Sequence, residues 1–96
     1  MSLGIGDSFK LTKNPISRTT LALFAGASGD HNPIHIDTDF VKKAGLDDVF
    51  AHGMLGMAYL GQLLTNNFSQ EKIRKYSAKF VSLTQIGAEF SLSGQI

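Results

Sequence analysis

The sequence predicts a single α+β domain in which a few strands accompany one central, apolar helix. Residues 53 to about 65 contain no charged side chain, as in a helix surrounded by other elements rather than one with a polar face. Apolar and polar residues alternate near Phe9 and again over residues 88–96, which is typical of strands. A chain of 96 residues is long enough for one core with little surplus, so we assign residues 1–96 to one domain.

The first strand and the first helix follow from local signals. The strand is predicted over residues 6–12, and Asn14-Pro15 ends it. Ser17 is a suitable N-cap for a helix over residues 18 to about 27. One face of this helix is predicted to be buried, because apolar and small residues recur at i, i+3, i+4 and i+7. These residues are Leu21, Phe24, Ala25 and Ser28.

A second, short helix is predicted from Thr38, as its cap, through Ala44, with Gly45 ending it. Residues 46–50 are predicted to be a loop. The uncharged central helix follows, and Asn66-Asn67 ends it.

Three glycines interrupt the central helix. Each is unfavourable in a helix by roughly 1 kcal/mol relative to alanine, and we expect close packing of another backbone to offset this. The glycines are Gly53, Gly56 and Gly61. After the helix the period changes, and two strands are predicted, over residues 73–83 and 88–96, with a turn at residues 85–87.

The richest chemistry lies in residues 28–37, SGDHNPIHID. Asp30 and His35 are five residues apart, which is wrong for one face of a helix, and Pro33 excludes helical geometry at the residue before it. A turn is therefore predicted, and a turn can direct the carboxylate and the imidazole to one point. Imidazole titrates near neutrality, so the pair is a candidate acid–base unit.

Gly53 is a candidate binding residue because it opens the central helix. Its N–H has no partner within the helix and lies at the positive end of the helix dipole. It can therefore donate to an oxygen that gains negative charge. Asn32 is expected to orient the turn or bond the Asp30/His35 pair, and His52, just before the helix, to fix a loop or to contact substrate.

The composition excludes several classes of protein and site. There are no cysteines, so disulfides and thiolate chemistry are absent. The net charge of the chain is +1. The basic residues are scattered along the sequence, which argues against a nucleic-acid-binding surface. No metal is predicted, because the three histidines lack a metalloprotease-like spacing. No cofactor is predicted either.

The longest apolar run is far shorter than the ~20 residues of a membrane span, and the N-terminus lacks a signal-peptide pattern, so a cytoplasmic protein is expected.

The chain resembles the MaoC-like dehydratases, (R)-specific enoyl-thioester hydratases that carry the hydratase 2 motif on a hot-dog fold. Residues 24–35, FAGASGDHNPIH, are similar to that motif, and residues 51–55, AHGML, to the start of the family's central helix. The resemblance implies an antiparallel sheet wrapped around the central helix. It also implies Asp30 and His35 as the catalytic pair and the Gly53 N–H as an oxyanion donor.

The implied reaction is reversible hydration of a trans-2-enoyl thioester, carried on CoA or acyl carrier protein, to the (R)-3-hydroxyacyl thioester. Two alternatives remain open: a hot-dog thioesterase, and a noncatalytic thioester-binding subunit of a hetero-oligomer. Family members usually continue for further strands, so the sheet is expected to be incomplete within one chain. We therefore expect an obligate homodimer or a higher homo-oligomer, in which neighbouring chains cover apolar surface.

Overall fold

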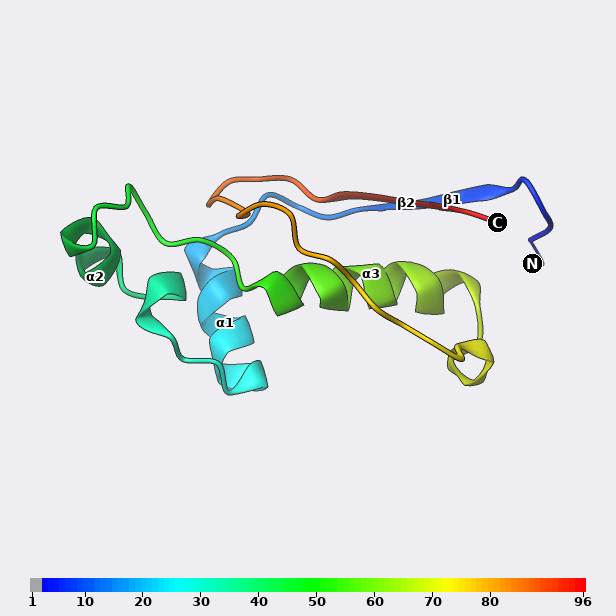
Figure 1. The fold of residues 1–96 in the computed structure, drawn as a ribbon, viewed down its shortest axis with the longest axis horizontal. Coiled ribbons are helices and arrows are strands. Elements are labelled where there is room, and N and C mark those ends of the chain that lie inside the picture. Colours follow the sequence, from blue (N-terminus) through cyan, green and yellow to red (C-terminus); the bar gives the residue numbers. More distant parts are fainter. Residues whose placement is uncertain (1–2) are drawn as a thin grey trace.

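A computed structural model describes residues 3–96; the first two residues of the predicted domain lie outside the described range. Two strands, three α-helices and two short 3-10 helices follow one another along the chain (Figure 1). In chain order they are β1 (Ser8–Thr12), α1 (Arg18–Ser28), η1 (Pro33–His35), α2 (Thr38–Lys43), α3 (Gly53–Asn67), η2 (Gln70–Lys72) and β2 (Ser91–Gln95). The molecule is elongated, 50 × 22 × 22 Å, with α3 lying along its length.

The two strands pair antiparallel, so the two ends of the chain lie side by side (Figure 1). The register runs from Ser8 opposite Gln95 to Thr12 opposite Ser91. In the second pair of this register the ring of Phe9 lies over Gly94, where an added Cβ would come within 2.5 Å of that ring. The predicted alternation is therefore confirmed for both terminal strands, and β2 needs a glycine where a neighbouring side chain crosses it.

The strand predicted over residues 73–83 is wrong. This segment runs across α3 as an extended chain without secondary structure (Figure 1). The chain pairs with the rest of the fold just after this segment, where the Ala51 N–H donates to the Thr84 carbonyl at 2.8 Å and Phe50 forms a bridge with Gln85. Within the segment, the Tyr76 hydroxyl donates to the Met57 carbonyl of α3. Alternation alone does not make a strand, because a strand requires a neighbour to accept its hydrogen bonds, and none lies along residues 73–83 within the described chain.

The helices around the Asp30 turn begin and end close to the predicted residues. The Ser17 hydroxyl caps α1 by accepting from the Thr20 N–H at 3.1 Å, as predicted. The predicted cap of α2 is off by one residue. Asp37 is the N-cap and accepts from the Phe40 N–H at 3.1 Å, while Thr38 is the first helical residue. Both residue types accept through a side-chain oxygen, and aspartate is the more favoured N-cap of the two.

The central helix α3 begins at Gly53, as predicted, and extends to Asn67. It is not surrounded on all sides. Among its residues only Leu55 and Leu63 are buried, and Met54 is 56% exposed. The glycines of α3 do contact other groups closely, but these groups are aromatic rings rather than a backbone. Phe80 lies on Gly53, Phe90 on Gly56 and Tyr76 on Gly61.

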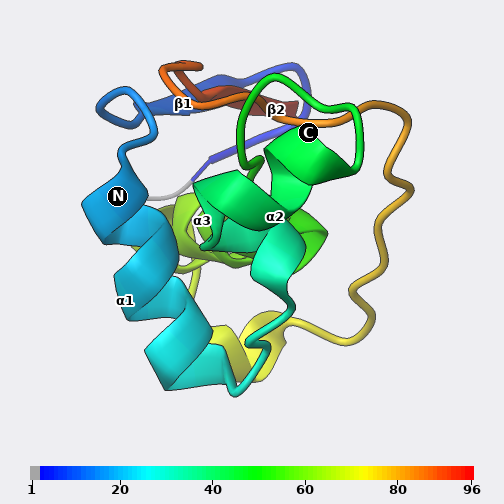
Figure 2. The same ribbon diagram turned by 90° about the vertical axis from the view of Figure 1, so that its left-hand side faces the viewer.

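The core lies at one end of the molecule, where α1, α2 and the beginning of α3 meet (Figure 2). Its buried members come from α1, α2, α3 and the segments just before α1 and α3. They are Ile16, Leu21, Val41, Val49, Ala51 and Leu55. The Asp30 turn and the first residue of α3 are both attached to this packed end, which gives the candidate site a fixed framework.

Candidate active site

The turn that carries the candidate acid–base pair is built by two side chains of the Asx type. After α1 the chain reverses at Gly29, whose φ of 79° lies in the left-handed region that favours glycine. The Asp30 Oδ1 then accepts from the Asn32 N–H at 3.3 Å, and the Asn32 Oδ1 accepts from the Ile34 N–H at 3.2 Å. Asn32 therefore stabilises the turn, as the sequence predicted, and its side-chain oxygen is occupied by a hydrogen bond within the turn.

His35 is held in one orientation by a backbone carbonyl. Its side chain is nearly buried, and its Nδ1 lies 2.7 Å from the Phe50 carbonyl oxygen. A carbonyl can only accept, so Nδ1 carries the hydrogen and donates it. In the neutral ring this leaves Nε2 unprotonated, and Nε2 lies 3.9 Å from the Asp30 Oδ2. The turn therefore brings together the two groups that the sequence singled out.

His52 lies against both members of this pair. It is 2% exposed, and its Nε2 lies 3.1 Å from the backbone carbonyl oxygen of Asp30. Its ring stacks on that of His35, with centroids 3.8 Å apart and planes 24° apart. The ring of Phe24, from α1, contacts it edge-on at 4.9 Å. Its Nδ1 is buried and has no hydrogen-bond partner among residues 3–96.

Gly53 begins α3 directly beside the two histidines. No side chain caps this helix end, so the first N–H groups of α3 have no such partner. The nearest group over the Gly53 Cα is the ring of Phe80, from the extended segment. An added Cβ would lie 3.5 Å from that ring, which is ordinary contact. The position predicted as an oxyanion donor is therefore at an uncapped helix N-terminus, with the Phe80 ring over its Cα.

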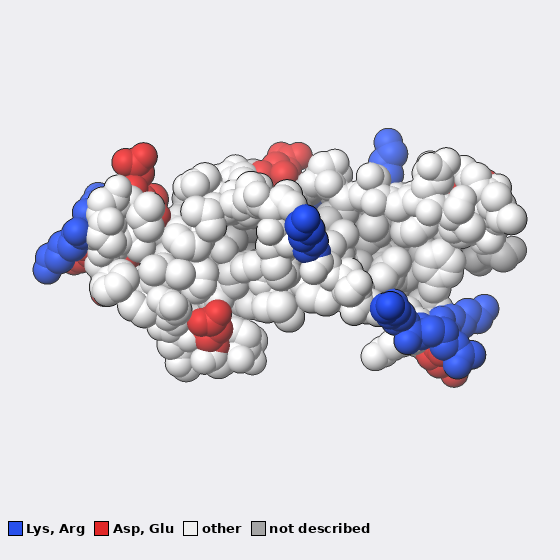
Figure 3. Space-filling view, in the orientation of Figure 1, with Lys and Arg blue, Asp and Glu red and all other residues white. Residues whose placement is uncertain are grey.

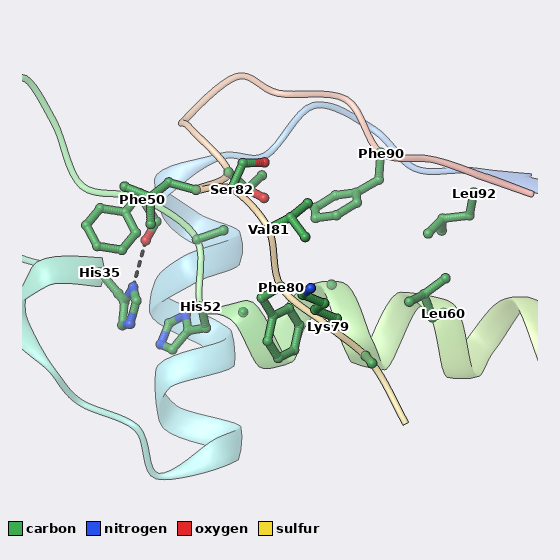
Figure 4. A pocket seen from close by; sticks show the side chains of 16 residues that line it. His35, Phe50, His52, Leu60, Lys79, Phe80, Val81, Ser82, Phe90 and Leu92 are labelled. Atoms are coloured by element: carbon green, nitrogen blue, oxygen red, sulfur yellow. Dashed lines mark hydrogen bonds between the residues drawn. The ribbon is translucent and has the colours of Figure 1, made fainter. Parts of the chain in front are cut away.

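Two separate cavities lie near these residues. The first, of about 350 Å³, lies beneath the extended segment and is lined by His35, His52, Gly53 and residues 78–84 (Figure 4). The second, of about 580 Å³, lies between α1 and α3. Its lining is apolar except at one end: Phe24, Met54, Met57, Ala58, Gly61 and Tyr76, with Ser28 and Asp30. Asp30 thus lines the second cavity and His35 the first, and the two side chains approach each other between them.

Charge is sparse around the two cavities. Figure 3 shows charged side chains scattered over a largely uncharged face. The first cavity has Lys79 on its wall, and the second has Asp30. No helix within residues 3–96 has the length and apolar character needed to cross a bilayer.

Asp30, His35 and His52 each offer one atom that could bind a metal, and these atoms lie within 4.8 Å of one another. The geometry fits a metal poorly. Ring-nitrogen lone pairs lie in the plane of the imidazole, so two nearly parallel stacked rings do not direct them to one point.

Two contributors to the site were missed from the sequence. The Phe50 carbonyl orients His35, and the Phe24 ring supports His52. A backbone acceptor leaves no trace in residue type, and the spacing of apolar residues indicates for Phe24 only a place on a buried helix face. The strongest available signal was that Phe24 opens the motif-like stretch.

Comparison with known proteins identifies the domain. A family model described as "MaoC like domain" matches residues 2–96. A mitochondrial 3-hydroxyacyl-[acyl-carrier-protein] dehydratase from Arabidopsis thaliana is 30% identical over 87 residues, covering 91% of this chain and 52% of that protein. An (R)-specific enoyl-CoA hydratase from Rhodospirillum rubrum is 37% identical over 59 residues, 62% of this chain and 40% of that protein.

The fold is found in solved structures as well. The (R)-hydratase from A. caviae superimposes with a TM-score of 0.73 at 27% identity, over 98% of this chain and 72% of that chain. The chain spans about half the length of the curated relatives it matches. The two strands and three helices are thus part of the hot-dog fold, with an incomplete sheet in this chain.

Proposed function

Because the chain belongs to the MaoC-like domain family, we propose that it hydrates trans-2-enoyl thioesters to 3-hydroxyacyl thioesters, and catalyses the reverse dehydration. The observation that carries this proposal is the approach of the Asp30 Oδ2 to the His35 Nε2, 3.9 Å apart, beside the open N-terminus of α3. Both the acid–base pair and a donor for the thioester oxygen are then within one site. The names of the two curated relatives and of the (R)-hydratase structure agree with this chemistry.

The hydrogen-bond pattern gives the pair a common task. Since His35 donates through Nδ1, its Nε2 is an acceptor in the neutral ring, and an ionised Asp30 is also an acceptor. A separation of 3.9 Å is too long for a direct hydrogen bond. It fits one water that donates to both groups, at about 2.8 Å from each and with about 90° between the two bonds. Such a water has its oxygen free to attack.

In the proposed reaction this water oxygen bonds to C3 of the enoyl group while the C2–C3 double bond becomes single. The pair Asp30/His35 takes a proton from the water and returns one to C2, so the protein ends in its starting state. The thioester oxygen gains negative charge on the way, and the Gly53 N–H is proposed to donate to it. The thioester bond itself stays intact.

The two cavities suggest how the substrate is arranged. The cavity lined by Phe24, Met54, Met57 and Tyr76 suits an acyl chain, because its wall is apolar beyond Asp30. The cavity beneath residues 78–84 suits the uncharged pantetheine arm of CoA or acyl carrier protein, and Lys79 on its wall offers a cation to the phosphate at the far end of that arm. The thioester would then lie at the Gly53 end of α3, between the two.

Turnover of crotonyl-CoA tests the proposal. Hydration removes the absorbance of the conjugated enoyl thioester and releases no free thiol. A hot-dog thioesterase would release thiol at the same rate as substrate is consumed. If the purified, folded protein does neither, with short and long enoyl chains and with both carriers, the proposed reaction is wrong and a noncatalytic thioester-binding role takes its place.

A further inference from the structure

We infer that His52 is a positioning residue for the Asp30/His35 pair, which deepens the proposed function and rests on it. His52 contacts both reacting groups, through a hydrogen bond to the backbone of Asp30 and a ring stack on His35. Neither contact uses the atoms that face the gap between Oδ2 and Nε2. His52 therefore acts on the reaction through its two neighbours rather than on the substrate.

The contact with Asp30 fixes which nitrogen of His52 carries a hydrogen. The Asp30 carbonyl oxygen can only accept, so the Nε2 of His52 must donate. The other nitrogen, Nδ1, is buried without a partner among residues 3–96, and a hydrogen there would meet no acceptor. The structure thus selects the ring with one hydrogen, on Nε2. This hydrogen bond spans 22 residues and ties the turn at Asp30 to the start of α3.

The contact with His35 fixes the plane of the reacting imidazole. The Phe50 ring limits the His35 ring from one direction, with centroids 5.3 Å apart and planes at 81°. The Phe50 carbonyl holds the Nδ1 of His35 at one point, and one hydrogen bond alone would leave the ring free to rotate about it. The His52 ring lies 3.8 Å from that ring, nearly parallel, and removes this freedom. Phe24 contacts the His52 ring in turn. The direction of the His35 Nε2 toward Asp30 therefore depends on His52.

The distance between the reacting groups makes this support important. At 3.9 Å the pair is not hydrogen-bonded to each other, so no direct contact keeps the two groups aligned. The Asp30 side chain is 52% exposed. The hydrogen bond that its carboxylate accepts from the Asn32 N–H is 3.3 Å long. A displacement of about 1 Å in such a constellation can lower the rate by about 100-fold.

Two variants of His52 separate the hydrogen bond from the space that the ring fills. In His52→Gln the side-chain amide nitrogen lies near the position of Nε2 and can still donate to the Asp30 carbonyl. In His52→Asn the amide nitrogen lies near the position of Nδ1 and cannot reach that oxygen. We expect H52N to lower kcat by about tenfold or more with little change in KM, and H52Q to restore most of the loss.

Thermal unfolding of both variants and the same substitutions in a D30N background complete the test. A residue that acts through Asp30 has little left to affect once that carboxylate is gone, so the effects of D30N and H52N on kcat should not be additive. A merely structural residue would lower the melting temperature of H52N and leave kcat of the folded fraction unchanged. Full kcat in folded H52N, or additive effects in the double variant, overturns the inference.

A measurement on the unaltered protein covers the case in which H52N does not fold. Nitrogen-15 NMR of the histidine rings distinguishes the two tautomers, and the inference requires a hydrogen on Nε2 of His52 and none on Nδ1. The opposite tautomer overturns it. If the unaltered protein shows the required tautomer but no hydratase activity, the proposed function fails, and the role of His52 in that reaction fails with it. If the unaltered protein is active and H52N equally so, only the role of His52 fails.

Discussion

Replacing Asp30 by asparagine exchanges one oxygen for a nitrogen and leaves the shape of the side chain unchanged. The remaining oxygen can still accept from the Asn32 N–H, as Oδ1 does at 3.3 Å, so the turn persists. The new amide nitrogen takes the place of Oδ2, 3.9 Å from the His35 Nε2. The amide nitrogen of the introduced asparagine would be a hydrogen-bond donor, whereas Oδ2 of Asp30 is an acceptor. A water molecule could then donate to the His35 Nε2 but not to that amide nitrogen.

The expected loss follows from the removal of one positioned acid–base group. Such groups contribute about 100-fold or more to the rate, which is about 2.7 kcal/mol in activation free energy. Stability should change little, because the Asp30 side chain is 52% exposed and exposed substitutions usually stay within about 0.5 kcal/mol. The predicted signature is a kcat on crotonyl-CoA lower by two orders of magnitude, with an unchanged melting temperature.

Asp37→Asn is the matched control for D30N. It removes a carboxylate seven residues away that accepts from the Phe40 N–H and caps α2, a task that asparagine performs equally well. D37N should therefore keep the kcat of the parent. If folded D30N also keeps most of that kcat, Asp30 takes no part in the proton transfer and the proposed pairing with His35 is refuted.

Three further outcomes are expected. Gly53→Val should lower kcat/KM more than stability, because its branched methyl groups would crowd both the Phe80 ring and the thioester oxygen; equal kcat/KM removes Gly53 from the site. The Arg18 guanidinium holds the pKa of Asp48 at about 2, below its ordinary 3.8, so this carboxylate stabilises the fold above about pH 4 and stops doing so as the pH falls toward 2. Asp48→Asn should therefore lower the melting temperature at pH 7, by a difference that shrinks below pH 4 in parallel melts. Light scattering of the 96-residue chain should show self-association at micromolar concentration, because the extended segment exposes apolar side chains such as Val81, 82% exposed; a stable monomer contradicts this.

The sequence was most informative where short-range physics decides the structure. Ser17 caps α1, Gly53 starts α3, and the turn between Asp30 and His35 exists because Asx side chains bond the backbone two residues on. Each of these features depends on residues within a few positions of one another, so residue types alone predict them.

The segment over residues 73–83 shows where that approach stops. Its alternation is real, but a strand also needs a neighbour, and the neighbour is decided by parts of the molecule far away in sequence. The orientation of His35 has the same origin. It depends on a carbonyl 15 residues away and on a ring stack with His52, and neither contact leaves a mark in the local pattern of residues.

The uncharged run of α3 has a different explanation from the one its pattern first suggests. Burial on all sides was expected, yet only two residues of the helix are buried. The other faces are accounted for by the two cavities. Met54, Met57, Ala58 and Gly61 line one, and Gly53, Gly56 and Leu60 line the other. If the proposed function holds, a charge on either face would be desolvated by the bound acyl thioester, at a free-energy penalty that few contacts offset. Absence of charge around the whole helix is therefore what a substrate-lined helix requires, and the same pattern would serve a helix covered only by protein.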